Sequence, residues 1–415
     1  MCVGKVRSAS ILIIALMAST FVTTAVAQGH YKILYTFGSA PGATLPQGAL
    51  VRDGAGNLYG TSNSGGSEPC TYGNGCGTVF KLAPQSDGSW SETVLYSFLG
   101  GDDGYDPVAG LVMDAAGNLY GTTYYGGAPN DGIVFKLGPN VDGSWTESII
   151  HTFSGADGEW PVASMIFDGV GNLYGTTSYG GPYGSDECGT VFKLSPNSDG
   201  SWTHSLLHAF NSYEGCDLES SVTLDASGDL YSAAWGGGPN GFYGTVFQLT
   251  PNSDGSWSMT LIYKFTDGKD GANPGPVVVD ATGTLYGTAS GWNDYGLGTV
   301  YKLKPNSDGT WTQTVLHTFT GYLDGGTPNG LIFDSHGYLY GTTIYGGANK
   351  YDGTVFRMKP NTDGTWTGRS LHQFGTGPKD GVSPNSLISD PSGNFYGTTP
   401  FGGSGATGIL FELIP

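Results

Sequence analysis

The sequence predicts an all-β protein, a seven-bladed β-propeller with four antiparallel strands in each blade. The phrase Gly-Asn-Leu-Tyr-Gly-Thr-Thr, or a near copy of it, occurs seven times. The mean spacing is (396 − 59)/6, about 56 residues, and the tyrosines of the copies are Tyr59, Tyr120, Tyr174, Tyr231, Tyr286, Tyr340 and Tyr396. A period of this length is typical of a supersecondary unit that stacks on copies of itself. Four short apolar runs in each repeat, and the unequal ends of the chain, complete the argument.

The second repeat shows the predicted unit. Its apolar runs cover residues 110–114, 118–123, 132–137 and 145–153. They are rich in β-branched and aromatic residues and are separated by turns with Asp, Asn and Gly, which is the pattern of a four-stranded antiparallel meander. No long stretch after residue 27 has the period of an amphipathic helix. Radial stacking of such sheets buries their faces and protects their edges.

The two ends of the chain predict how the ring closes. Residues 32–37 match only the fourth strand of the unit, and residues 408–413 match only the third. We therefore expect the N-terminal strand to complete the last blade, because an open array would expose two unpaired edges.

Residues that recur in every repeat first suggest structural roles. An aspartate ends the first strand and is expected to accept hydrogen bonds from the turn that follows; these are Asp53, Asp114, Asp168, Asp225, Asp280, Asp334 and Asp390. A tryptophan that opens the fourth strand is expected to pack between blades, at Trp90, Trp145, Trp202, Trp257, Trp311 and Trp366. Four histidines share one register of the fourth strand with tyrosines and so are interpreted as strand residues: His151, His208, His317 and His372.

Residues 1–27 are predicted to be a signal peptide, cleaved after Ala27, which leaves 28–415 as the propeller. Lys5 and Arg7 precede an apolar run, and Ala25-Val26-Ala27 forms an A-x-A site. We expect a secreted, monomeric protein, extracellular or periplasmic, without a membrane span. After cleavage, 14 Lys and Arg oppose 35 Asp and Glu, a balance of 14 − 35 = −21. Such a charge excludes nucleic acid and anionic membrane as expected partners.

Four cysteines remain after the predicted cleavage, and two disulfides are expected, Cys70–Cys76 and Cys188–Cys216. Loop-closure entropy predicts stabilisation of about 2.4 kcal/mol for the short ring and about 3.6 kcal/mol for the longer one. Zinc binding is the alternative, but no histidine stands at a ligand-like spacing from these cysteines.

Variation in length is confined to the loops between second and third strands and to the crossovers between blades. In a four-stranded meander these segments share one face, where binding is expected. Aromatic residues gather there in blades three to five, and the candidate ligand-binding residues are Trp160, Trp235, Trp292, Tyr179, Tyr183, Tyr243 and Tyr295. Exposed aromatics suit stacking on sugar rings or packing on a protein. The alternative is that they fill the rim of the central channel.

The crossovers also repeat an acidic residue followed by glycine. The acids are Asp103, Asp157, Glu214, Asp270, Asp324 and Asp380. A ring of carboxylates is a candidate Ca²⁺ site, because calcium accepts oxygen ligands in flexible geometry. The alternative, which we favour, is that each acid belongs to a turn; Ca²⁺ is the only cofactor that the sequence suggests.

The pattern Gly-Leu-(Val/Ile)-x-Asp-x-x-Gly-Asn-Leu-Tyr-Gly-Thr-Thr, followed by Gly-Thr-Val-Phe-Lys-Leu, resembles the bacterial extracellular choice-of-anchor tandem repeat GloVer-containing proteins. The resemblance covers nearly all of the chain after residue 27. It implies a secreted or surface repeat protein, and it carries over no catalytic residue. The fourth repeat departs from the pattern, with Ser232-Ala-Ala in place of Gly-Thr-Thr.

These observations lead to three functional hypotheses. The first is a secreted, non-enzymatic propeller that binds a glycan or a protein through the aromatic loop face. The second is an extracellular carbohydrate-active hydrolase, lyase or lactonase with loop carboxylates at the mouth of the channel. The third is a structural surface protein. No serine–histidine–aspartate set, phosphate loop or metal triad is evident in the sequence, so an enzyme would need scattered loop acids.

Overall fold

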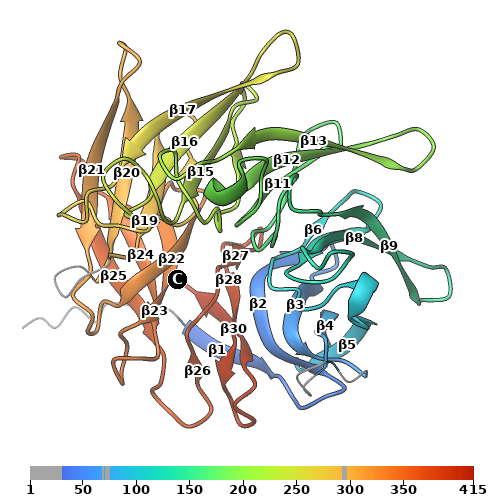
Figure 1. Cartoon of the computed structure of the whole chain (residues 1–415). Helices are drawn as coiled ribbons and strands as arrows, with labels where there is room; N and C mark the ends of the chain where they lie inside the picture. The colour runs from blue at the N-terminus through green and yellow to red at the C-terminus, as the bar shows by residue number, and fades with distance from the viewer. Residues whose placement is uncertain (1–29, 68–69, 71–74, 292–296) are drawn as a thin grey trace, which may run out of the picture.

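The computed structural model describes residues 30–67, 70, 75–291 and 297–415. It confirms the predicted fold, with seven four-stranded antiparallel sheets arranged in a ring (Figure 1). The described residues contain no α-helix, only two 3-10 turns, η1 (Gly101–Asp103) and η2 (Gly184–Asp186). The described residues thus include no helix that is long and apolar enough to cross a membrane.

The first three blades follow one another along the chain. Blade 1 contains β2 (Ala43–Arg52), β3 (Leu58–Gly65), β4 (Thr78–Pro84) and β5 (Trp90–Ser97). Blade 2 contains β6 (Val112–Met113), β7 (Leu119–Thr123), β8 (Ile133–Pro139) and β9 (Trp145–Thr152). Blade 3 contains β10 (Ile166–Phe167), β11 (Leu173–Thr177), β12 (Thr190–Pro196) and β13 (Trp202–Ala209).

The next three blades repeat this order. Blade 4 contains β14 (Thr223–Leu224), β15 (Leu230–Ala234), β16 (Thr245–Pro251) and β17 (Trp257–Lys264). Blade 5 contains β18 (Val278–Val279), β19 (Leu285–Ala289), β20 (Thr299–Pro305) and β21 (Trp311–Thr318). Blade 6 contains β22 (Gly326–Phe333), β23 (Leu339–Tyr345), β24 (Thr354–Pro360) and β25 (Trp366–Gln373).

Blade 7 joins the two ends of the chain, as predicted. Its strands are β27 (Ile388–Ser389), β28 (Phe395–Thr399), β30 (Ile409–Ile414) and the N-terminal β1 (His30–Thr36), while β26 (Gly381–Val382) and β29 (Phe401–Gly402) form a small separate ladder. β1 runs antiparallel to β30, from His30 opposite Ile414 to Thr36 opposite Ile409. Figure 1 shows these first and last strands side by side, β1 in blue and β30 in red.

Aromatic residues connect each blade to the next around the whole ring. A ring that follows the fourth strand packs on the ring in the third strand of the next blade, with centroids 4.5–5.3 Å apart. The pairs are Phe37–Phe80, Phe98–Phe135, Phe153–Phe192, Phe210–Phe247, Phe265–Tyr301, Phe319–Phe356 and Phe374–Phe411. Because this set has no gap between blade 7 and blade 1, the ring is closed by packing as well as by β1.

The glycine of the repeated phrase makes room for these aromatic rings. A Cβ atom on Gly121 would lie 2.6 Å from Cζ of Phe135, so a side chain would collide with the ring. In blade 4 the same place is taken by Ser232, opposite Phe247. There the Phe210 and Phe247 rings come to 4.5 Å at 51°, closer and flatter than the other six pairs. The departure of the fourth repeat thus changes ring packing and leaves the blade intact.

The structure confirms the roles predicted for the recurrent aspartates and tryptophans. Asp114 accepts backbone hydrogen bonds from Ala116 and Asn118, and side-chain hydrogen bonds from Asn118 and Tyr120. Each tryptophan of the fourth strand packs on the repeated tyrosine of the preceding blade; Trp202 and Tyr120, for example, have ring centroids 5.7 Å apart at 67°. Both features fix the hairpins and the angle between neighbouring blades.

Both predicted disulfides are present, Cys70–Cys76 and Cys188–Cys216. The second joins the loop between the second and third strands of blade 3 to the crossover that leads into blade 4. It therefore tethers two segments of the variable face across a blade junction.

Candidate functional site

The two kinds of variable segment meet on one face, as expected. Tyr105 in the crossover to blade 2 forms a β-bridge with Tyr125 in the loop after β7, and Glu159 forms one with Tyr179 in blade 3. Similar bridges join Cys216 to Gly236 and Pro274 to Ala289. We call this surface the loop face.

On the loop face of blades 2 and 3, five aromatic side chains form a continuous row, which we call the aromatic strip: Tyr105, Tyr125, Tyr124, Trp160 and Tyr179. The centroids of the Tyr105 and Tyr125 rings lie 5.1 Å apart at 25°. The Trp160 ring lies nearly parallel to that of Tyr124, 5.6 Å away at 13°, and is 5.5 Å from that of Tyr179 at 27°. Tyr179 is 41% exposed, and the other four side chains are half-buried.

Backbone geometry holds Trp160 at the centre of the strip. Its φ is +57°, a value that is strained for a bulky residue. Its N–H donates to the carbonyl oxygen of Asp131, and its own carbonyl accepts from Ser178. The same positive φ, from 52° to 58°, recurs at the equivalent point of the other six repeats, at Leu45, Asp106, Asp217, Asn273, Thr327 and Ser383. The ring thus presents six kinds of side chain on one repeated backbone conformation, with aspartate at two of the seven positions.

Carboxyl groups with raised pKa values surround the strip. Burial raises the pKa of Asp106 and of Asp217. Burial, together with neighbouring acids, raises the pKa of Asp131 and of Glu159. The turn aspartates behave in the opposite way, because hydrogen bonds from the turn outweigh burial and lower the pKa of Asp114. Few N–H or O–H groups of the protein donate hydrogen bonds to the acids near the strip. Their carboxyl oxygens therefore remain able to accept hydrogen bonds from a ligand.

Asp217 and Glu219, from the crossover into blade 4, add negative charge near the same strip. Desolvation by the surrounding protein, together with the charge of Asp217, raises the pKa of Glu219, although this residue is exposed at the surface. Burial raises the pKa of Tyr124, and the charges of Glu219 and Asp217 contribute. These interactions place the acids of one crossover within electrostatic range of an aromatic ring two blades earlier.

The structure brings together only part of the predicted aromatic set. Trp160 and Tyr179 are in contact, whereas Tyr183 lies half-exposed immediately before η2. Tyr243 packs against the core between blades 4 and 5, which makes it partly structural. Trp235 is half-buried beside Asp217, to whose carbonyl its N–H donates. The remaining two candidates, Trp292 and Tyr295, lie outside the described residues.

Three members of the strip were missed in the sequence: Tyr105, Tyr124 and Tyr125. The last two directly follow the buried strand β7 (residues 119–123), and that position was the available signal. A residue leaving a buried strand at its end must emerge on the face where the strand ends.

The six crossover acids pair with the fourth-strand rings of their own blades. The pairs are Tyr96–Asp103, His151–Asp157, His208–Glu214, Tyr263–Asp270, His317–Asp324 and His372–Asp380. Most of these acids also cap their turn; Asp157, for instance, accepts from the backbone and hydroxyl of Ser154. Among the described residues, no three of the six lie close enough to share one ion. Their placement matches the turn interpretation that we favoured, and Ca²⁺ binding stays a prediction.

One of these pairs has a third titratable neighbour. His151, Asp157 and His204 place ligand atoms within 4.8 Å of one another. The two imidazoles are stacked, with centroids 4.2 Å apart and planes 6° apart. A nitrogen lone pair lies in the plane of its ring, so one ion cannot lie in two parallel planes at once. Burial, together with the charge of His151, lowers the pKa of His204 to about 4, which favours a neutral His204 imidazole near pH 7.

Comparisons with known proteins add the family. No curated protein matches this chain in sequence. Three solved structures resemble most of this chain at 12% sequence identity each. A Trichoderma reesei protein of carbohydrate-active enzyme family AA12 aligns over 94% of this chain and 96% of its own (TM-score 0.44), and the PQQ domain of pyranose dehydrogenase from Coprinopsis cinerea over 94% and 98% (TM-score 0.46). A protein of unknown function from Dyadobacter fermentans aligns over 83% of this chain and 98% of its own (TM-score 0.41). At these identities and TM-scores they carry no argument about this chain. The model of the Gloeobacter/Verrucomicrobia repeat family matches residues 17–241 and 219–415. The chain therefore belongs to the Gloeobacter/Verrucomicrobia repeat family.

Proposed function

We propose that this protein is secreted and binds a glycan through the aromatic strip and the acids around it. The observation that carries the proposal is the row of five aromatic rings, whose neighbouring planes hold one another in place. Because the rings are already ordered, a ligand that packs on them loses little side-chain entropy on their account. The two disulfides agree with an oxidising compartment.

The charges near the strip favour a carbohydrate over other ligands. A sugar offers apolar C–H faces for the rings and many hydroxyl donors for carboxylates. The acids near the strip include Asp131, Glu159 and Asp217. When they are ionised, their carboxylates accept hydrogen bonds and donate none. Together with a net charge of −21 after the predicted cleavage, they favour a neutral or cationic glycan over an anionic one.

A glycan array probed with residues 28–415 tests this proposal. Its matched variant is Trp160→Asn, because Asn273 has the same backbone conformation at the equivalent point of blade 5. We expect wild-type protein to bind neutral or amino-sugar glycans, and Trp160→Asn to bind them at least tenfold more weakly. Equal binding of glycans by both proteins would show that the strip is not the binding site. Binding to a protein partner and to no glycan would show that the ligand is a protein.

A second candidate function is favoured by the raised pKa values of Asp217 and Glu219. A carboxyl group that stays protonated at higher pH can serve as a general acid, while a second carboxylate serves as a base. We infer that, if the bound glycan is cleaved, these two acids act on it. Incubation with each bound glycan, followed by assay for new reducing ends or unsaturated products, tests this; Glu219→Gln should abolish such products and retain binding.

A further inference from the structure

The seven blade junctions share one local arrangement outside the aromatic strip. Each contains a histidine or tyrosine from the fourth strand of one blade, usually paired with the crossover acid. A third residue comes from the fourth strand of the next blade, opposite the Leu or Met of its third strand; we call it the junction residue. By this register the junction residues are Glu92, Glu147, His204, Met259, Gln313, Gly368 and Tyr31.

Two junctions hold an aromatic ring as the junction residue, and both rings are stacked. Tyr31 lies on His372 with centroids 3.5 Å apart and planes 9° apart, and its hydroxyl donates to Oδ1 of Asp380 at 2.7 Å. His204 lies on His151 in the same manner, at 4.2 Å and 6°. A planar ring therefore fits on the histidine of both junctions, and at the Tyr31 junction its polar hydrogen also reaches the acid.

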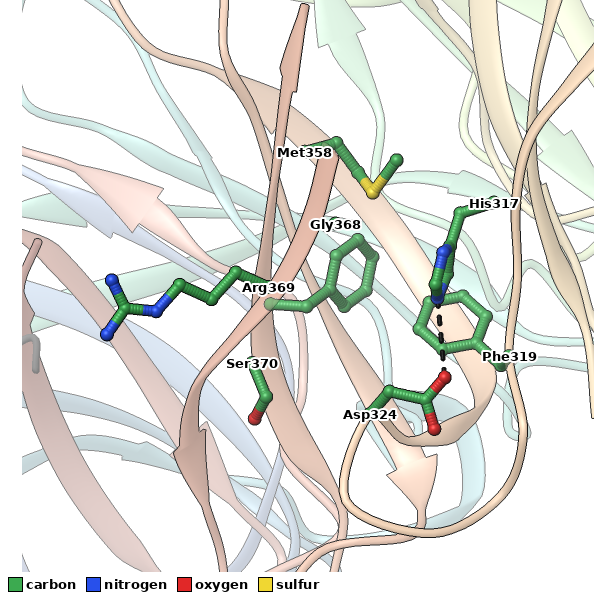
Figure 2. Close-up of a pocket in the computed structure, with 8 residues that line it drawn as sticks. His317, Phe319, Asp324, Met358, Gly368, Arg369 and Ser370 are labelled. Atoms are coloured by element: carbon green, nitrogen blue, oxygen red, sulfur yellow. Dashed lines mark ion pairs between the residues drawn. The ribbon is translucent and has the colours of Figure 1, made fainter. Parts of the chain in front are cut away.

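The junction between blades 5 and 6 has Gly368 at this position and so lacks the third side chain. A cavity of about 50 Å³ opens there, lined by His317, Asp324, Phe319, Phe356 and Met358 among others. Figure 2 shows the His317–Asp324 pair on one side of the space, with Gly368 across from it and the Arg369 side chain leading away. The volume exceeds the roughly 10–15 Å³ that a single water needs but is smaller than the roughly 150 Å³ of a cavity that encloses benzene, so a ring bound here is enclosed only in part.

The backbone does not require glycine at position 368. Gly368 lies inside β25, paired with Met358, and has no positive φ. The nearest atoms to a Cβ built there are side-chain atoms, Sδ of Met358 at 3.0 Å and Nδ1 of His317 at 3.2 Å. Glycine within a strand costs conformational entropy, and it often marks a place where another group approaches closely. The three nearest atoms to that Cβ all belong to the side chains of Met358 and His317, which would have to move by a few tenths of an ångström to admit it.

We propose that this cavity binds one planar aromatic ring that carries an O–H or N–H donor, such as a small phenol or azole. The ring stacks on His317, as Tyr31 stacks on His372, and its donor hydrogen-bonds to Asp324. Phe319, Phe356 and Met358 provide an apolar wall. The His317–Asp324 pair is 27% and 28% exposed, against 12% and 4% for His372–Asp380, so the space is open to solvent. The site lies two blades from the strip and is independent of glycan binding.

Titration of the mature protein by two-dimensional NMR tests this proposal without any substitution. The probes are phenol and imidazole, with toluene as a ring without a donor and cyclohexanol as a donor without a planar ring. We expect saturable shifts at Gly368, Ser370 and His317 with phenol or imidazole, with a dissociation constant on the order of 1 mM for so small a ligand. Toluene and cyclohexanol should bind at least tenfold more weakly. N-acetyl-tyrosinamide distinguishes two sources of the natural ligand. If it binds more tightly than phenol, the ligand is a tyrosine side chain of a peptide; if it binds more weakly, the ligand is a free small molecule.

Two substitutions provide the matched controls. Gly368→Met places at this junction the residue found between blades 3 and 4, and it should abolish the shifts. Met259→Gly should open a second site beside His208 and Glu214. Absence of saturable shifts in wild-type protein, or shifts that persist in Gly368→Met, would overturn the proposal; should Gly368→Met not fold, the wild-type titration alone decides.

Discussion

Trp160 stacks on Tyr124 across the junction of blades 2 and 3, with ring centroids 5.6 Å apart and planes 13° apart. The contact exists because the strained backbone of Trp160 turns its side chain toward the end of β7 (residues 119–123) in the preceding blade. A pair of this kind links the rigid repeat to the variable face. It is also the centre of the aromatic strip on which the proposed binding depends.

The strip and the core should respond differently to loss of a tryptophan. Trp202→Ala removes the contact with Tyr120 between two blades. Because Trp202 is half-buried, we expect a loss of about 2–3 kcal/mol, below the range of about 3–5 kcal/mol for a fully buried aromatic. Trp160→Asn should cost less than half as much, since it leaves the blade packing intact. Urea unfolding of both variants measures this, and equal losses would make Trp160 a core residue.

Removal of the N-terminal strand should open the ring. β1 pairs with β30 over its whole length, Tyr31 donates to Asp380, and Phe37 packs on Phe80 of blade 1. A protein that begins at residue 38 loses all three interactions and exposes an edge of blade 7. We expect calorimetry to show a lower melting temperature and a broader transition. An unchanged, cooperative transition would contradict closure by β1.

The sequence predicted the blades, the closing strand and both disulfides, because these follow from a repeat whose hydrogen bonds and buried residues recur in every copy. Of the five rings in the aromatic strip, it indicated Trp160 and Tyr179 as candidates but missed Tyr105, Tyr124 and Tyr125. Contacts between loops depend on backbone turns such as that at Trp160, which no composition or spacing specifies. The cavity at Gly368 was missed for a related reason: it arises from the absence of one side chain at a junction between two repeats.

Glu147 should make stability depend on pH. Its Oε1 is buried without a hydrogen-bond partner in the described structure, and burial together with Asp103 raises its pKa to about 7. A group with a raised pKa in the folded state contributes stability below its unfolded value, near 4.5, and that contribution is lost as pH rises through about 7. Glu147→Gln should therefore be more stable than wild type at pH 8, by about 1–2 kcal/mol after allowance for partial exposure. Melting temperatures at pH 4.5, 6 and 8 measure the difference between the two proteins, and a difference that does not grow with pH would refute this account.

The longer disulfide should contribute more than the shorter one. The Cys188–Cys216 bridge closes a separation of 28 residues, whereas Cys70–Cys76 closes 6. Loop-closure entropy predicts losses of about 3.6 and about 2.4 kcal/mol when each is replaced by paired serines. Urea unfolding of the Cys188→Ser/Cys216→Ser and Cys70→Ser/Cys76→Ser proteins gives both values. The opposite order would show that native contacts, and not chain entropy, dominate.

Affinity electrophoresis in native gels tests the central claim, that the aromatic strip binds a glycan, most directly. Wild type, Trp160→Asn and a control, Tyr322→Ala, are run through gels that contain xyloglucan, glucomannan, mixed-linkage β-glucan, chitosan or polygalacturonate. Tyr322 is 67% exposed and lies in the crossover into blade 6, away from the strip. We predict that a neutral or cationic polysaccharide retards wild type and Tyr322→Ala but not Trp160→Asn, and that polygalacturonate retards none. Retardation of Trp160→Asn equal to that of wild type, or no retardation of wild type in any gel, would contradict the account.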